Sequence, residues 1–364
     1  MKKEFTTLML ILIGLTGVKA QDVQLVTLQK GEETQVFYGA DAFIEAMAAA
    51  DHGNTITLTA GTFNATNITK AVTIYGAGYE TNVDKEKLAE EPEKYPTRIN
   101  GNFDIALDSI EGRPAEGLYI EGIYSNKTIT VQNKLVAASF IKCRFGFFKF
   151  GNVSDGGTKS EDCSFIHCRI ADRFFPGESK SMSIINSIIN AFLGTYNERS
   201  TIMIQNNIII GLADKLEGGV LKNNIIGDVY FQDLENFTGD YYHSLSNYPV
   251  YTNIATFHNL FGNKRALDSV ITKDGNWIDT NWATILFGES GIKEYSDTYS
   301  YQLTEEAKKT YLGTDGTEIG IYGGETPFSP ILTIPRIIKK EIAPKTENGK
   351  LKVNIKVEIG NNFL

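Results

Sequence analysis

A short pattern of aliphatic and polar positions recurs along much of the chain, with a period of about 20 residues. The stretch IMIQNNI from Ile202 serves as a seven-position template. Close copies are GVLKNNI from Gly219, MSIINSI from Met182, SFIHCRI from Ser164 and SFIKCRF from Ser139, and weaker copies are LYIEGIY from Leu118, TRINGNF from Thr97 and VTIYGAG from Val72. Short β-branched segments at this period predict a β-solenoid, in which each coil of the chain stacks on the preceding one.

Two positions of the template form columns when the copies are aligned. The third position is aliphatic: Ile74, Ile99, Ile120, Ile141, Ile166, Ile184, Ile204 and Leu221. The fifth position is Gly, Cys or Asn: Gly76, Gly101, Gly122, Cys143, Cys168, Asn186, Asn206 and Asn223. Gly reaches positive φ and Asn tolerates it, and stacked asparagines hydrogen-bond to one another. We therefore predict that the fifth position is an inward-facing bend with an asparagine ladder that includes Asn206.

These NN-centred coils resemble the right-handed parallel β-helix of the pectin lyase-like superfamily, including its asparagine ladder. The stretches ADHGNTITLTAGTF from Ala50 and ITKAVTIYGAG from Ile68 resemble the first coils of secreted β-helix proteins. The stretch DGTEIGIYGGETPF from Asp315 resembles a closing motif of β-helix proteins from gut Bacteroidetes. The resemblance implies an all-β, right-handed parallel β-helix, with FYGADAFIEAMAAA from Phe37 as a capping helix over its N-terminal end.

The ends of the chain have patterns of their own. Lys2 and Lys3, the apolar run LMLILIGL from Leu8 and a small residue at Ala20 have the layout of a secretory signal peptide. No later segment approaches the roughly 20 apolar residues of a membrane helix. We therefore expect a signal peptide over residues 1–20 and a mature chain without a transmembrane segment that is secreted, periplasmic or at the cell surface.

The remaining chain is expected to divide into two parts. The β-helix domain is assigned to residues 21–330. Beyond it, NGKLKVNIKVEIG from Asn348 alternates apolar and polar residues with the period of a half-buried strand. Residues 331–364 are therefore predicted to be a C-terminal β extension that packs on the β-helix.

The net charge limits the kinds of binding partner, and the cysteine count limits the disulfides. The net charge of -9 without a Lys/Arg stripe argues against a nucleic-acid partner, while a local basic pocket leaves an acidic polysaccharide open. Three cysteines allow at most one internal disulfide. Cys143 and Cys168 are neighbours in one column, so both a disulfide and two buried free thiols remain open, and Cys163 is unpaired in either case.

The sequence has none of the strong catalytic motifs that we looked for, namely a GxSxG elbow, HExxH, a P-loop or a Cys pair at zinc spacing. The resemblance implies what to look for instead. Superfamily lyases that act on uronic-acid polymers use Arg or Lys as the base and a cation or Arg to neutralise the carboxylate. The nearest catalytic candidates are Arg144 and Arg169, at the sixth position of consecutive coils, with Asp172 and Arg173 just beyond.

Further candidates concern binding. Lys142 and His167 share the fourth position beside the arginines and predict either a patch for an anionic sugar or a solvated turn. Trp277 and Trp282 can stack on sugar rings or belong to the core of the final coils. The superfamily often binds calcium, Ca2+, through acidic residues of adjacent coils, but no acidic cluster recurs in register here. No metal site or cofactor is therefore expected, and Ca2+ binding stays open with little support from the sequence.

Three functions remain open, because fold alone does not specify activity. The leading expectation is a secreted, non-catalytic protein that contacts glycans or other surfaces. The alternatives are a polysaccharide lyase or glycoside hydrolase acting on acidic polysaccharide, and a structural spacer. The sequence leaves open whether the protein is an enzyme.

Overall fold

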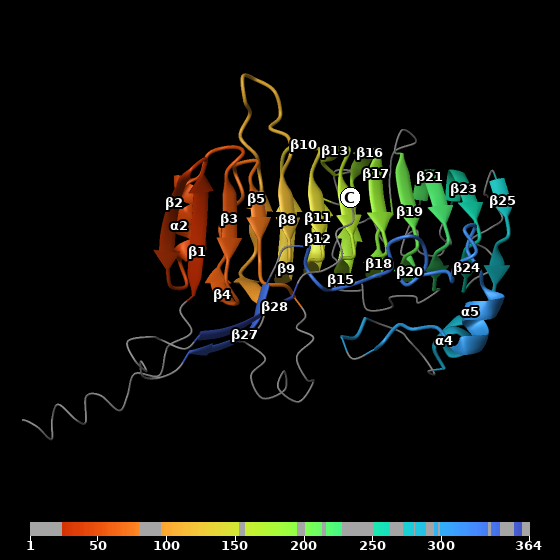
Figure 1. Cartoon of the computed structure of the whole chain (residues 1–364). Helices are drawn as coiled ribbons and strands as arrows, with labels where there is room; N and C mark the ends of the chain where they lie inside the picture. The colour runs from red at the N-terminus through yellow and green to blue at the C-terminus, as the bar shows by residue number, and fades with distance from the viewer. Residues whose placement is uncertain are drawn as a thin grey trace, which may run out of the picture.

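The chain forms a parallel β-helix, as the repeat predicts (Figure 1). The computed structural model describes residues 24–79, 96–152, 157–194, 201–212, 216–227, 251–262, 272–279, 281–288, 295–297, 299–333, 336–342 and 353–358. The expected signal peptide lies outside these residues.

One long sheet has twelve strands, and apart from the antiparallel pairs β1–β2 and β1–β3 its neighbours are parallel. In spatial order it contains β2 (Glu33–Tyr38), β1 (Leu25–Lys30), β3 (Thr55–Leu58), β5 (Thr73–Tyr75), β8 (Tyr119–Glu121), β11 (Ser139–Ile141), β14 (Ser164–Ile166), β17 (Met182–Ile185), β19 (Ile202–Gln205), β21 (Leu216–Lys222), β23 (Tyr251–Phe257) and β25 (Thr272–Asp274).

A second parallel sheet has eleven strands. It contains β26 (Trp277–Ile278), β24 (Leu260–Phe261), β22 (Ile225–Ile226), β20 (Ile208–Leu212), β18 (Ile188–Phe192), β15 (Arg169–Phe175), β12 (Arg144–Phe150), β9 (Ile123–Val131), β6 (Thr97–Asn100) and β4 (Gly61–Asn64), with β7 (Phe103–Ile105) beside β9. A short third sheet contains β10 (Leu135–Val136), β13 (Lys159–Glu161) and β16 (Glu178–Lys180).

The N-terminal end of the solenoid is covered, as expected. Helix α2 (Ala42–Ala49) buries Phe43 and Met47 against the first coils. The antiparallel hairpin of β1 and β2 continues the long sheet beyond β3. Covering the first coil in this way hides backbone groups that would otherwise pair with another chain.

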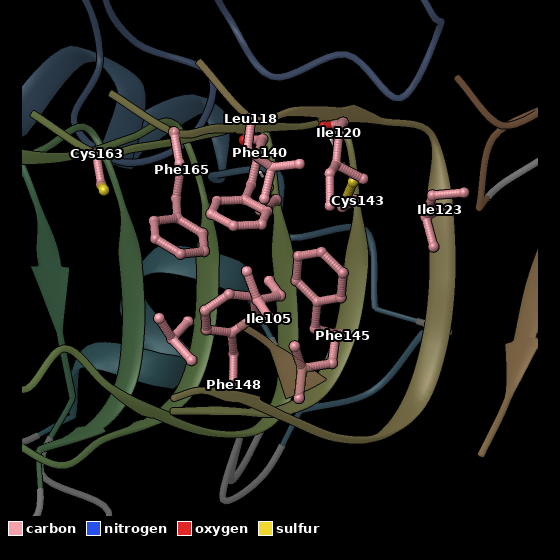
Figure 2. Close-up of a cluster of buried hydrophobic side chains, with 14 of the residues drawn as sticks. Ile105, Leu118, Ile120, Ile123, Phe140, Cys143, Phe145, Phe148, Cys163 and Phe165 are labelled. Carbon is pink, nitrogen blue, oxygen red and sulfur yellow. Dashed lines mark hydrogen bonds between the residues drawn. The ribbon is translucent and has the colours of Figure 1, made fainter. Parts of the chain in front are cut away.

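The interior of the solenoid is filled by stacked aliphatic and aromatic side chains (Figure 2). Phe140 and Phe165 come from adjacent coils and stack with ring centroids 4.7 Å apart and an interplanar angle of 14°. Phe148 meets Phe165 edge-on at 5.0 Å. Such close ring contacts add to the free energy gained by burial alone.

The strand register corrects the sequence alignment at three places. Ile120 pairs with Phe140 rather than Ile141, and Phe165 pairs with Ile184, so the copies from Ser139 and Ser164 are shifted by one residue. Ile99 belongs to the other long sheet, where β6 pairs with β9. Because side chains alternate along a strand, each one-residue shift moves a side chain to the opposite face.

The shift also divides the predicted bend column into two columns. The bend residues have positive φ and include Lys142, His167, Asn186, Asn206, Asn223 and His258. The following residue in each coil points inward and forms the ladder: Cys143, Cys168, Ser187, Asn207, Asn224, Asn259 and Asn276. Asn206 therefore occupies the bend, as predicted, but the ladder member is Asn207.

The ladder is continuous through hydrogen bonds between coils. The Asn207 backbone N–H donates to Asn224 Oδ1 over 2.9 Å, and the Asn207 Nδ2 donates to the Ile184 carbonyl over 2.8 Å. The thiols continue this pattern, because Cys168 Sγ donates to the Phe140 carbonyl at 3.2 Å. All three cysteines are buried and free.

After the last coils the chain turns back along the outside of the solenoid (Figure 1). Helices α4 (Trp282–Phe287) and α5 (Glu305–Thr310) come first, and Thr304 caps α5 by accepting from the Ala307 N–H. Residues 311–333, here called the C-terminal strap, then run from the last coils toward the first. Outward side chains of the second sheet and side chains of the returning segment form a second apolar core: Tyr79, Ile188, Ile208, Ile210, Ile225, Leu260, Trp282, Leu286, Tyr301, Leu303, Ala307, Ile319, Ile321 and Phe328.

The strap binds the bend column coil by coil. Its Leu312 carbonyl lies 2.8 Å from His258 Nδ1, and its Thr326 carbonyl lies 2.9 Å from His167 Nε2. Between these points the Asn186 Nδ2 donates to the Ile321 and Gly323 carbonyls, each at 2.8 Å. The bend column is therefore the track along which the returning chain lies.

The predicted alternating strand is present as β28 (Val353–Glu358). It pairs antiparallel with β27 (Arg336–Ile342) in a two-stranded sheet. Among the described strands its partner is thus another part of the tail and not a coil of the solenoid.

Candidate functional site

One outward column of the second sheet changes chemistry along the solenoid. Four successive coils place Arg98, Tyr124, Arg144 and Arg169 at paired positions. The next coils place Ile188, Ile208, Ile225, Leu260 and Trp277 in the same column. We call Arg98, Arg144 and Arg169, with Tyr124 between the first two, the arginine row. The structure thus confirms that Arg144 and Arg169 are stacked neighbours and adds Arg98 and Tyr124 to them.

Tyr124 lies between two guanidinium groups. The Cζ of Arg98 is 4.7 Å from the centre of the Tyr124 ring, and the Cζ of Arg144 is 4.6 Å from it. Cations over an aromatic face are attracted by the ring quadrupole. The ring therefore holds both arginines close to the surface of the sheet.

A carboxylate from the returning chain meets the row. Asp297 accepts from Arg144 through both oxygens, at 3.1 Å from Nε and 2.7 Å from Nη2. The nearest nitrogen of Arg169 lies 3.8 Å from Asp297. Tyr295 donates its hydroxyl hydrogen to Asp297 and receives a hydrogen bond from Arg169 at 3.4 Å. Two-point pairing of this kind fixes the guanidinium plane as well as its position.

These contacts determine the charge state of the site. Burial opposes ionisation of Asp297, but its hydrogen bonds with Arg144 and Tyr295 and the charge of Arg169 lower its pKa below the usual range. Burial raises the pKa of Tyr295, and the charge of Asp297 adds to this increase. Asp297 is therefore an anion and Tyr295 a neutral phenol at neutral pH.

Two donors of the row lack acceptors in the described part of the chain. Asp297 meets Arg144 and Arg169, whereas Arg98 lies over the ring of Tyr124. The Nε of Arg98 and the Nη1 of Arg144 are buried and have no hydrogen-bond partner in the described part of the chain. Buried donors are nearly always paired in native proteins. The arrangement is suited to a further anionic or carbonyl oxygen.

Lys142 and His167 do not face solvent, which corrects both interpretations of them. Their side chains are fully buried beneath the C-terminal strap. The Lys142 Nζ donates to the Ile331 carbonyl, close to the buried carboxylate of Glu121, which accepts from the Thr333 N–H at 2.6 Å. These residues fasten the strap and take no part in an accessible patch.

His167 is kept neutral by its surroundings. Burial lowers the pKa of His167 to about 4, and the charge of Lys142 acts in the same direction. The hydrogen bond with the Thr326 carbonyl opposes the shift without reversing it. The strap therefore lies on an uncharged imidazole at neutral pH.

Asp172 and Arg173 form a separate pair. Arg173 lies beyond a register shift in the pairing of β15 with β18, opposite Ala191 rather than in the arginine row. Its Nε is 3.1 Å from Asp172 Oδ1, and its guanidinium covers the Phe147 ring at 4.6 Å. Arg169 begins strand β15, whereas Asp172 and Arg173 lie in the middle of that strand. The pair therefore belongs to a different part of the surface.

The two tryptophans pack against the end of the solenoid. Trp282 is buried in the second apolar core and is 3% exposed, so it offers no face to a sugar. Trp277 is half-buried and meets Tyr311 edge-on at 5.4 Å and His258 at 5.7 Å. The core interpretation is correct for Trp282, and Trp277 packs against that core.

The described residues contain no group of three or more His, Cys, Asp or Glu arranged to hold a metal ion. A cavity in the N-terminal coils is lined only by aliphatic and aromatic side chains, including Phe43, Ile74 and Phe148. It lies in the solenoid interior and is a packing defect rather than a ligand site. Across the described residues, no helix is long and apolar enough to cross a membrane.

Four residues of the site were not predicted from the sequence. Arg98 and Tyr124 stand at the outward position next to the columns that were aligned, so a correct strand register would have found them. Tyr295 and Asp297 lie more than 120 residues from their partners in a segment without a repeat. No local pattern marks them.

Comparison with protein-family models, with curated proteins and with solved structures finds no match to this chain.

Proposed function

We propose that the protein is an exported β-helix protein of the pectin lyase-like type that binds an acidic polysaccharide on the arginine row without cleaving it. The observation that carries the proposal is the arginine row itself, which places Arg98, Arg144 and Arg169 at paired positions of neighbouring coils. Within it, Arg98 Nε and Arg144 Nη1 lack described acceptors. Guanidinium forks match the geometry of carboxylate groups. The signal-peptide pattern at Lys2 and Lys3 supports export.

The spacing of the row supports a polymer rather than a single anion. Successive coils are about 4.8 Å apart, which is close to the repeat of a pyranose chain. A chain lying along the solenoid axis would therefore meet a cation on three of the four coils of the row. Tyr124 holds two of these cations, Arg98 and Arg144, over its ring in the same column.

Binding is favoured over lyase chemistry by the charge states in the row. A lyase needs a base that can accept the α-proton near neutral pH. Burial raises the pKa of Tyr295, so its phenolate is not available, and Asp297 is held by Arg144. Burial opposes the charge of Arg144, but the hydrogen bond with Asp297 raises its pKa, so the arginine that a superfamily lyase would use as the base stays protonated here.

The test is titration calorimetry with polygalacturonate and alginate as acidic probes and dextran as a neutral control. We expect acidic chains to bind, and Arg144→Ala to weaken that binding by about tenfold or more, as the loss of a charged hydrogen bond predicts. Lys149→Ala is the matched control, because Lys149 lies over Phe147 on the same sheet, outside the row.

The same mixtures are followed for unsaturated and reducing ends. Product that disappears with Arg144→Ala would replace the binding proposal with the lyase alternative. Absence of binding to every acidic chain would leave the structural spacer.

A further inference from the structure

The carboxylate of Asp297 already occupies the place where an acidic ligand would pair with the row. It lies outside the guanidiniums, because the Asp297 side chain is 53% exposed while those of Arg144 and Arg169 are 12% and 7% exposed. Its two-point contact with Arg144 is the geometry that a uronate carboxylate would adopt. Asp297 and such a ligand therefore compete for the same donors.

The backbone around Asp297 is held without help from its side chain. The Tyr295 N–H donates to Asn190 Oδ1 at 2.9 Å, and the Ser296 N–H donates to the Tyr301 hydroxyl at 3.0 Å. Tyr301 in turn donates to the Ser296 carbonyl at 3.1 Å. The Asp297 carboxylate can leave Arg144 for water by side-chain rotation while this backbone stays in place.

Exchange of the two carboxylates would leave no buried charge without a partner. Arg144 keeps an anionic acceptor in both states, and Asp297, already half exposed, gains water. A buried anchor would behave differently, because removing one partner of a buried pair leaves an uncompensated charge.

We infer that the Asp297 carboxylate is an internal competitor that occupies the arginine row in the free protein and is displaced by the carboxylate of an acidic saccharide. This inference rests on the proposed function and concerns the regulation of the same site. The ligand can bind only while Asp297 is away from Arg144, so the apparent affinity equals the intrinsic affinity multiplied by the fraction of molecules in that state. If that fraction is about one tenth, removing the competitor strengthens binding about tenfold.

The experiment compares the full chain with Asp297→Asn, using a galacturonate pentamer as the probe in titration calorimetry. We expect the dissociation constant to fall about tenfold in Asp297→Asn. Asp172→Asn removes the same charge from an equally exposed aspartate, which pairs with Arg173 outside the row. That control should change the dissociation constant less than twofold, which separates competition from the general effect of net charge.

A double-mutant cycle makes the test specific to the pair. In an Arg144→Ala background, Asp297→Asn should no longer strengthen binding, because the contested donor is gone. If Asp297→Asn does not fold, as judged by thermal unfolding, Asp297→Ser is used in the same cycle.

The outcomes separate the inference from the function on which it rests. Binding by the unmodified chain that is unchanged or weakened in Asp297→Asn would overturn the competitor and leave the binding function in place. Equal strengthening with and without Arg144 would also overturn the competitor. Absence of binding in every variant would overturn the binding function, and the competitor with it.

Discussion

The two halves of the outward column on the second sheet have the same register and different surroundings. In the apolar half, Ile188, Ile225 and Leu260 are fully buried under the returning chain. In the basic half, Arg144 keeps some exposure and meets a carboxylate that is half in solvent. An aliphatic stripe has to be covered, whereas a guanidinium row needs only acceptors. The same returning segment therefore forms an apolar core in one half and an ion pair with a half-exposed carboxylate in the other.

The ladder inside the solenoid differs between the halves in a parallel way. Asn207 and Asn224 lie next to the apolar half, and each both donates and accepts between coils. Cys143 and Cys168 lie next to the arginines, and their thiols donate weakly to carbonyls. Interior hydrogen bonding is thus stronger beneath the covered half than beneath the candidate site.

The largest expected effect is on the ladder beneath the apolar half. Asn207→Leu removes the acceptor of the Ser187 N–H and the donor to the Ile184 carbonyl, and buried groups without partners cost 1–3 kcal/mol each. We expect a loss of about 4 to 5 kcal/mol in the free energy of unfolding, measured by urea denaturation.

Asn206→Leu is the matched control for the ladder. Asn206 has φ of 55°, so leucine there is strained by about 1–2 kcal/mol without breaking the ladder. A larger loss from Asn206→Leu than from Asn207→Leu would mean that the ladder runs through the bend column.

The sequence predicted the solenoid and the stacked arginines because both follow from the repeat, and the resemblance to β-helix proteins predicted the capping helix. The sequence did not predict the register. Phe140 and Phe165 occupy the inner column, but the neighbouring Ile141 and Ile166 match the aliphatic residues of the other copies and were aligned with them instead. It also could not place Asp297, which reaches Arg144 from an irregular segment 153 residues away. Tertiary contacts of that range have no signature in the local pattern of one sequence.

The next effect concerns the cover of the apolar half. Ile225 is fully buried between the second sheet and the returning chain. Ile225→Ala should lower the free energy of unfolding by about 3 to 4 kcal/mol through lost burial and the resulting cavity. Lys149→Ala, on the same sheet outside the second core, should cost less than about 1 kcal/mol in the same urea titration. Equal losses would mean that the returning chain does not cover this half.

Acid should loosen the strap that joins the two halves. His167 in the unfolded chain takes up a proton near pH 6.5, whereas burial lowers its pKa in the folded protein to about 4. The unfolded state therefore binds more protons between these values, and stability falls as the pH drops from about 6.5 to about 4. The shift corresponds to about 3 kcal/mol at the lower pH.

His167→Asn tests this acid dependence, because Asn186 and Asn206 show that asparagine fits the same bend. The variant should lose that part of the pH dependence when urea midpoints are compared between pH 7.5 and pH 4. His258→Asn, at the strap's other end, should leave the contribution of His167 in place. An unchanged slope in His167→Asn would exclude the buried imidazole as its source.

The smallest effect is expected in the ladder beneath the basic half. Cys168 donates to the Phe140 and Ile166 carbonyls, and the next ladder member, Ser187, donates to the Ile185 carbonyl over 2.9 Å with a hydroxyl. Serine thus satisfies the same ladder position one coil away. Cys168→Ser should change the free energy of unfolding by less than about 1 kcal/mol, because a weak donor is exchanged for a stronger but more polar one. A loss as large as that from Asn207→Leu would show that the thiol is held by packing that a hydroxyl cannot reproduce. Substitutions in the ladder beneath the arginines would then destabilise the protein as much as those beneath the covered half.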